Sequence, residues 1–179
     1  MALNWTNLQT AIYTAVNSAG ITGLDVSWRY TLGAAPIPAK PFCTLQLTTT
    51  DLAPGALSAT FDEFRPVAGT PTNFNLVHQR RHTLSIQVYT NTTQGSGSAS
   101  DLLGQINRHL AKQSTQAALL AASIRLWQTS SVRDLSAVLD TRDEGRAQCD
   151  YALATQDTTA DNIGNILTVD LTGVDVNAP

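Results

Sequence analysis

The clearest two-residue alternation of apolar and polar side chains lies within the stretch from Ser131 to Leu171. One face of the strand that it predicts is apolar or small, and is formed by Gly145, Ala147, Cys149, Tyr151 and Leu153. The other face is polar, and is formed by Glu144, Arg146, Gln148 and Asp150. This is the pattern of a half-buried strand with a charged outer face. No nucleophile-base pair, glycine-rich phosphate loop or strong metal-ligand spacing accompanies the strand, so binding is a better role for it than catalysis.

Apolar residues at intervals of three and four predict three helices. The first covers Leu3 to Ala19 and is stopped by Gly20, which tolerates the left-handed conformation. The second is capped by Ser100 or Asp101 and runs through Leu110. A short third helix is expected from Ser114 through Ala122.

Further alternating stretches predict strands on both sides of the helix pair, at 24–30, 42–49, 77–90, 124–129 and 162–171. The stretch from Val77 to Thr90 is expected to be the longest of them. This order of elements predicts the α+β class, as a two-layer sandwich in which helices cover one face of a largely antiparallel sheet. The length of 179 residues suits a single domain, 1–179.

Two segments lack a clear pattern. Residues 33–41 contain three prolines and should form an extended connector. The stretch at about 50–74 is long for a structureless connection in a compact domain, yet it contains Phe61 and Phe64. We expect this stretch to be an arm that becomes ordered against a partner.

Composition narrows the functional classes. Charged residues make up 14% of the chain and its net charge is −3, which argues against a nucleic-acid-binding domain. The N-terminal residues show neither a secretory signal nor a membrane segment, so we expect no membrane partner and assembly in the cytoplasm. Cys43 and Cys149 read as two buried small apolar side chains, and a bridge is geometrically possible only if their strands are neighbours.

Acidic residues offer the best candidate for chemistry. Asp140, Asp143, Glu144 and Asp150 could hold a magnesium ion for a nuclease or hydrolase reaction. The competing interpretation is a solvated turn whose charge is neutralised by interleaved arginines. Histidines offer a weaker metal site, at His78, His82 and His109. We predict no metal, no cofactor and no catalytic residue.

A short basic cluster is formed by Arg80 and Arg81, with Arg65 as a further candidate. It could contact the phosphates of DNA that passes through a pore, or an acidic neighbouring subunit. An ordinary solvated strand end explains it equally well.

The last third of the chain contains Val132, Arg133, Asp134 and Leu135, then Glu144, Arg146, Ala147 and Asp150, and then Ile163, Ile166 and Val169. In these residues the chain resembles the phage neck and tail terminator proteins. The order of elements along the rest of the chain is similar as well. The resemblance implies a non-enzymatic virion protein that forms a ring, commonly of six subunits, between the head connector or adaptor and the tail tube.

On this interpretation Glu144, Arg146 and Asp150 make charge pairs across a subunit contact, and the arm with Phe61 and Phe64 grips a neighbouring ring. Ion pairs within one chain are the alternative for the three charged residues. A head-completion or connector-adaptor protein and a tail tube subunit remain open as other structural roles. A metal-dependent nuclease remains the enzymatic alternative.

Overall fold

A computed structural model describes residues 5–29, 37–52, 60–61, 72–128, 130–139 and 142–163. Side chains are described over 5–29, 37–47, 80–128, 130–137 and 144–155. The elements are α1 (Trp5–Asn17), β1 (Asp25–Trp28), β2 (Phe42–Leu52), β3 (Thr60–Phe61), β4 (Thr72–Thr90), α2 (Ala99–Leu110), α3 (Gln113–Ala121), β5 (Ile124–Gln128), β6 (Arg133–Asp134), β7 (Ala137–Leu139) and β8 (Arg142–Ile163).

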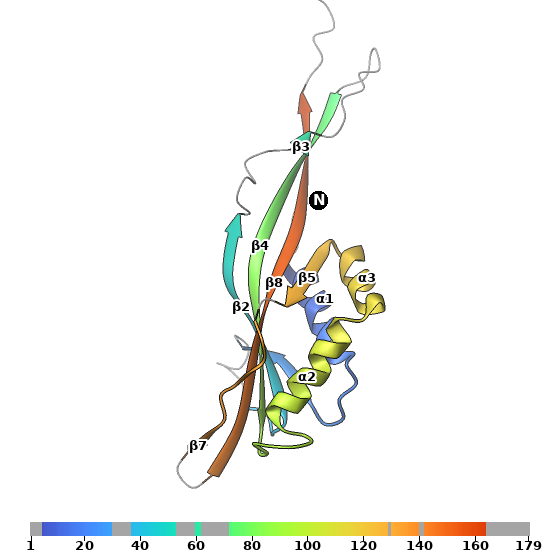
Figure 1. Ribbon diagram of the computed structural model, residues 1–179. Helices are drawn as coiled ribbons and strands as arrows, with labels where there is room; N and C mark the ends of the chain where they lie inside the picture. The colour runs from blue at the N-terminus through green and yellow to red at the C-terminus, as the bar shows by residue number, and fades with distance from the viewer. Residues whose placement is uncertain are drawn as a thin grey trace, which may run out of the picture.

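Two long central strands organise the sheet. Its strand order is β1-β2-β4-β8-β5, with β3 paired to β4 and both β6 and β7 paired to β8. Among the strands that the structure describes, only the β1–β2 pair is parallel. All three helices lie on one side of the sheet, which confirms the predicted two-layer α+β sandwich (Figure 1). We call that side the helix face and the opposite side the outer face.

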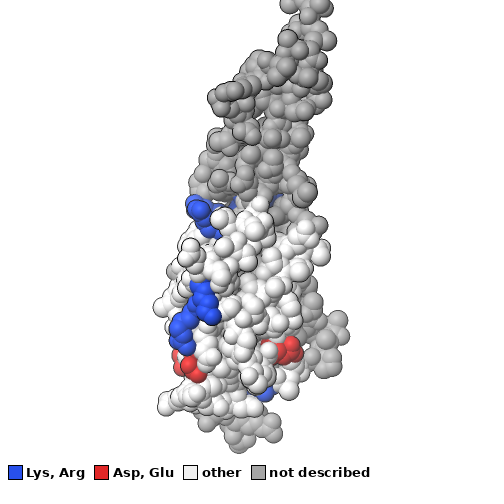
Figure 2. All heavy atoms as spheres, turned by 90° about the vertical axis from the view of Figure 1, so that its right-hand side faces the viewer, with Lys and Arg blue, Asp and Glu red and all other residues white. Residues whose placement is uncertain are grey.

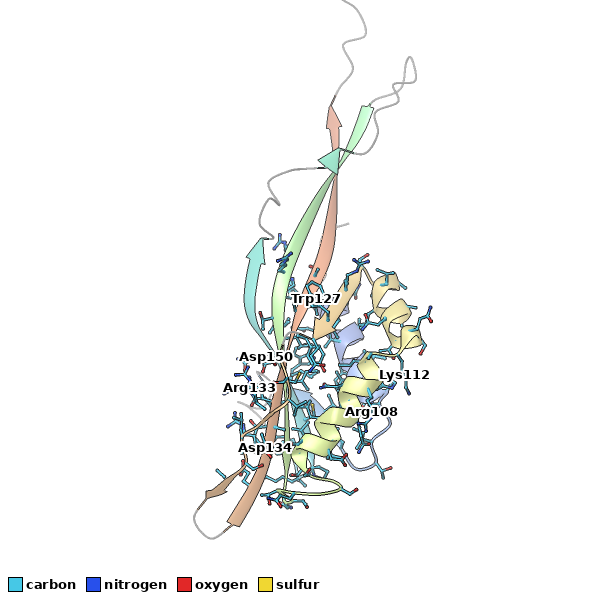
Figure 3. The ribbon with its side chains drawn as sticks, in the orientation of Figure 1. Arg108, Lys112, Trp127, Arg133, Asp134 and Asp150 are labelled. Atoms are coloured by element: carbon cyan, nitrogen blue, oxygen red, sulfur yellow. The ribbon has the colours of Figure 1, made fainter. Side chains whose placement is uncertain are left out.

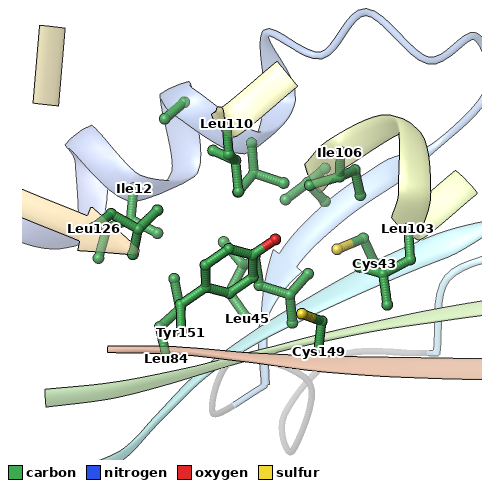
Figure 4. Packing of buried hydrophobic residues seen from close by; sticks show 14 of the residues in the cluster. Ile12, Cys43, Leu45, Leu84, Leu103, Ile106, Leu110, Leu126, Cys149 and Tyr151 are labelled. Atoms are coloured by element: carbon green, nitrogen blue, oxygen red, sulfur yellow. The ribbon is translucent and has the colours of Figure 1, made fainter. Parts of the chain in front are cut away.

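The core lies between the helices and the middle of the sheet. Leu103, Ile106 and Leu110 of α2 are at most 2% exposed. They pack with fully buried residues of the central strands into one cluster (Figure 4). The members contributed by β4 and β8 are Leu84, Ile86, Val88, Ala147, Cys149, Tyr151 and Leu153. The predicted apolar face of the strand at 145–153 is therefore confirmed.

Several predicted boundaries differ from those observed. The side chain of Ser98, not that of Ser100 or Asp101, caps α2 by accepting a hydrogen bond from the Asp101 amide. The Asp101 carboxylate in turn accepts a hydrogen bond from the Gly97 amide, and the two bonds together fix the start of the helix. The predicted strand at 77–90 belongs to β4, which begins earlier, at Thr72, and has 19 residues; β8, which contains the central predicted strand, is longer still, with 22.

Beyond the helices, β4 and β8 continue as a two-stranded ribbon. Their antiparallel pairing is unbroken from Thr90↔Gly145 to Thr72↔Ile163, and the far half rises clear of the helices (Figure 1). Short β3 pairs with β4 in this part. The predicted arm at 50–74 overlaps these strands, although residues 53–59 and 62–71 lie outside the described residues, as does the part of the predicted 162–171 strand after Ile163.

Residues 124–139 follow the free edge of β8 in three short pieces. Strand β5 pairs with 151–155, β6 with 147–148 and β7 with 142–144. Ser130 joins the pieces, since its amide donates to the Asp150 carbonyl at 3.2 Å and its Oγ accepts from the Asp150 amide at 2.8 Å. This edge strand holds Arg133 beside the polar row of β8.

Candidate assembly surface

The outer face of the sheet is covered by none of the described helices and carries the polar row predicted on β8. Arg146, Gln148 and Asp150 alternate with the buried residues Ala147 and Cys149, so their side chains project away from the helices. The neighbouring strands add polar residues to the same face, among them Gln46 and Tyr89, which are partly exposed, and Gln87, which is buried. The result is a polar sheet face that is open to solvent in part.

Two of the predicted interface residues form ion pairs within the chain. The Lys40 Nζ lies 2.9 Å from the Glu144 Oε2, and the Arg133 Nη2 lies 2.6 Å from the Asp150 Oδ2. The intrachain alternative therefore describes Glu144 and Asp150 in the single subunit. Because all four side chains keep access to solvent, each pair contributes at most about 1 kcal/mol to stability. A further role of these residues in a subunit contact stays a prediction.

Arg146 is held by a different kind of contact. One terminal nitrogen donates a 2.9 Å hydrogen bond to the Gln87 Oε1, which also accepts from the Tyr89 hydroxyl at 2.8 Å. The guanidinium lies over the Tyr89 ring, and the Tyr89 ring also stacks on the Phe42 ring, with 4.6 Å between the ring centroids. Arg146 thus belongs to an aromatic and amide cluster at one end of the outer face.

The predicted basic cluster is divided by the strand geometry. Arg80 shares the helix face of β4 with His82, whereas Arg81 is exposed on the outer face, because successive strand residues point to opposite sides. Arg65 lies outside the described residues. A contact of these arginines with DNA stays a prediction.

Register places Arg81 near a residue that the sequence pattern did not single out. Arg81 and Arg125 are both direct partners of Ala154, one from each side of β8. Arg125 is exposed on the outer face, since Ile124 and Leu126 on either side of it are buried. No local motif could reveal this pair, because strand pairing alone brings residues 81 and 125 together.

The candidate metal ligands are not assembled among the residues that the structure describes. No group of three His, Cys, Asp or Glu residues suited to an ion occurs there. Asp140 lies outside those residues, and the side chains of Asp143 and His78 are not described.

The two described histidines lie in separate environments. His82 is buried against the Trp5 ring and lies 3.2 Å from the Thr155 Oγ1. His109 contacts the Ser18 and Thr115 hydroxyls at 2.9 and 3.3 Å, between the helices. Burial, followed by the charge of a nearby cation, Arg80 or Lys112, lowers the pKa of each imidazole.

Both cysteines are buried free thiols, as predicted. Cys43 lies on β2 and Cys149 on β8, with β4 between them, so their strands are not neighbours. Burial raises the pKa of Cys43 to about 12. The Cys43 thiol is therefore not suited to act as a nucleophile.

A hollow of about 250 Å³ lies beside the edge strand β5, between its end and α2. Its lining includes Leu110, Gln116 and Trp127, and at its base the Tyr151 hydroxyl donates a hydrogen bond to the Asn107 Oδ1. Burial raises the pKa of Tyr151 above its usual value, so the hydroxyl stays protonated. The hollow has the groups of a packing site, not of a reaction centre.

Phe61 and Phe64 complete the predicted interface set. Phe61 lies in β3, opposite Leu76 of β4, and its side chain is not described. Phe64 lies outside the described residues. Their part in a subunit contact stays a prediction.

Comparison with models of protein families gives a match to the family described as phage neck terminator protein, over residues 6–178. The chain belongs to this family. The match confirms the resemblance found in the sequence, and it includes both the helix-covered part of the sheet and the ribbon. A search of curated proteins finds no match.

Membership in the phage neck terminator family gives the protein a structural role in the virion, with other head or tail proteins as its partners. In the part of the chain that the structure describes, no helix has the length and apolar character needed to span a membrane. For a protein of this family, the exposed polar sheet face and the projecting ribbon are the surfaces to consider for assembly.

Proposed function

We propose that the chain forms a closed ring of identical subunits at the head–tail junction. In this ring, six subunits cap the tail tube and join it to the head connector after assembly in the host cytoplasm. The family match over residues 6–178 carries the proposal. As a structural part the protein needs no cofactor and catalyses no reaction.

Two features of the subunit support a role in assembly. The outer face is a sheet surface without a second layer among the described residues, and the ribbon continues beyond the helices (Figure 1). An isolated two-stranded ribbon is only marginally stable in water, so its length favours packing against another molecule. A ring in which each subunit contacts the next at unlike surfaces would use both features.

The alternative structural roles predict different assemblies. A tail tube subunit forms open-ended stacks, whereas a terminator stops at a closed ring. A connector-adaptor would bind the head connector without binding the tail tube. The nuclease alternative requires metal-dependent cleavage of DNA.

Native mass spectrometry and negative-stain imaging of the purified chain test this proposal. The expected result is one species of six times the 19.1 kDa subunit mass, seen as a ring with a central channel. A chain that stays monomeric at micromolar concentration would contradict the ring, and filaments would favour the tube subunit. Incubation with plasmid DNA and Mg²⁺ should leave the DNA intact, and cleavage would instead support the nuclease.

A further inference from the structure

Charge is unevenly distributed over this chain. The whole sequence has 11 Lys and Arg against 14 Asp and Glu. The outer face nevertheless carries six described cations, Arg29, Lys40, Arg81, Arg125, Arg133 and Arg146. It carries three described carboxylates, Asp25, Glu144 and Asp150. The outer face is therefore positive on a chain that is negative overall.

The helix face is different in character. Its described surface is mostly uncharged, and the largest group of basic side chains forms one short column, with smaller basic areas above and below it (Figure 2). Arg108 and Lys112 lie on the helices, away from the sheet (Figure 3). These two residues give a cationic surface for comparison that an outer-face contact would not use.

Arg81 and Arg125 form the sharpest feature of the outer face. Both flank Ala154 in the same cross-strand row, which places their backbones about 10 Å apart, since adjacent strands are about 4.8 Å apart. Ala152 and Ala154 provide a low floor between them, and Trp127, 40% exposed, stands in the next row. We call the two arginines, together with the alanines between them, the notch.

The arginines of this notch have no ion-pair partner among the described side chains, where the ion pairs are Lys40–Glu144 and Arg133–Asp150. In the register of the sheet, Asp51 of β2 is the direct partner of Arg81. Arg125 stands on the edge strand, with Ala154 as its partner. Among the described side chains, Arg125 is therefore an exposed cation without an acidic partner.

The ribbon has acidic charged residues, opposite in sign to most of those on the outer face. Its strands, 72–79 of β4 and 156–163 of β8, contain Asp157 and Asp161 and neither Lys nor Arg. These two acidic residues are four positions apart in an extended strand, which corresponds to about 13 Å. This spacing is within reach of two long arginine side chains about 10 Å apart.

We propose that the ribbon of one subunit lies across the outer face of a second copy of the chain, with Asp157 and Asp161 opposite Arg81 and Arg125. This contact rests on the proposed ring and specifies how neighbouring subunits meet. It joins two unlike surfaces, so repetition closes a ring when the rotation between subunits allows it. It also gives the ribbon a packing surface that the described residues of its own subunit do not provide.

Charge-exchange variants test the contact. Arg125→Glu alone, and together with Arg81→Glu, should abolish the ring in native mass spectra while circular dichroism and the urea midpoint show a folded monomer. Asp157→Arg with Asp161→Arg should do the same. Combining all four substitutions in one chain should restore the ring, because each pair is then reversed in sign.

Arg108→Glu is the matched control, since it reverses an exposed arginine on the helix face, and it should leave the ring intact. Rings that survive Arg81→Glu with Arg125→Glu would overturn the contact, as would a folded fourfold variant that stays monomeric. If these rings survive but lose salt-dependent binding to duplex DNA, the notch is a DNA surface and the contact is wrong. A monomeric unmodified chain would overturn the ring and this contact with it.

Discussion

Arg146 and Tyr89 are direct partners across β8 and β4, and the guanidinium carbon of Arg146 lies 5.3 Å from the centre of the Tyr89 ring. The same guanidinium donates to Gln87. This arrangement uses the planar, delocalised charge of arginine, which stacks on an aromatic ring and donates to an amide at once.

Arg146→Glu should lower assembly without unfolding the subunit. The loss of the contact with the Tyr89 aromatic ring and of the hydrogen bond to Gln87 should reduce the free energy of unfolding by about 1–2 kcal/mol. Urea unfolding measures this change, and native mass spectrometry measures the oligomer. Loss of the fold at unchanged oligomer size would instead place Arg146 in the core network.

Gly145→Ala should destabilise the subunit because the new Cβ has no room. It would collide with the Thr90 Oγ1 and with the Thr92 carbonyl oxygen. Overpacking of this kind costs about 1–3 kcal/mol, measured by urea unfolding. Gly104→Ala is the control, since its Cβ would meet only the Arg108 Nη1 at 3.7 Å within α2, and it should stabilise by up to about 1 kcal/mol. Equal effects of the two substitutions would contradict the close approach at Gly145.

Two adjacent leucines of α3 offer a matched pair. Leu119 is 2% exposed and Leu120 is 59% exposed. Leu119→Ala should lower the free energy of unfolding by about 2–5 kcal/mol through lost burial and a cavity. Leu120→Ala should change it by no more than about 0.5 kcal/mol in the monomer. Similar losses at both positions would show that α3 is packed in another orientation.

Stability should fall as the pH is lowered from about 7 to 5, because burial, together with Arg80, lowers the pKa of His82 below its usual 6.5. The unfolded chain binds the proton more readily, so the contribution of His82 is fully present above the unfolded pKa and is lost as the pH falls from there through the lower folded pKa. Urea midpoints across this range should show a weaker slope in His82→Gln. His109→Gln should also weaken the slope, since the pKa of His109 is lowered too, and a slope unchanged in the double variant would contradict this account.

The ribbon explains why part of the strand prediction failed. Alternation is visible where one face of a strand is buried, as at 145–153 under α2. Beyond the helices, β4 and β8 pair through backbone hydrogen bonds, which need no apolar pattern. The segments at 72–76 and 154–161 therefore gave no strand signal, although β4 and β8 run through them without interruption.

For the candidate surface, too, the local pattern predicted the direction of the side chains but not their contact partners. The local pattern correctly assigned Glu144, Arg146 and Asp150 to the polar face of β8, because side-chain direction follows from backbone geometry alone. Their partners Lys40, Gln87 and Arg133 could not be predicted, since these residues are 17 to 104 positions away and are brought close by strand pairing. The separation of Arg80 from Arg81 was implicit in the alternation, although the two are neighbours in sequence.

The amino-acid sequence by itself determined the class of the fold, the helices, the apolar face of the central strand and the family, because these depend on periodicity and residue type along the chain. The tertiary structure decided the register of β4, β8 and β5, and with it the notch between Arg81 and Arg125. It also decided how far the ribbon continues past the core. Both depend on which distant segments pair, and no local pattern of side chains records that choice.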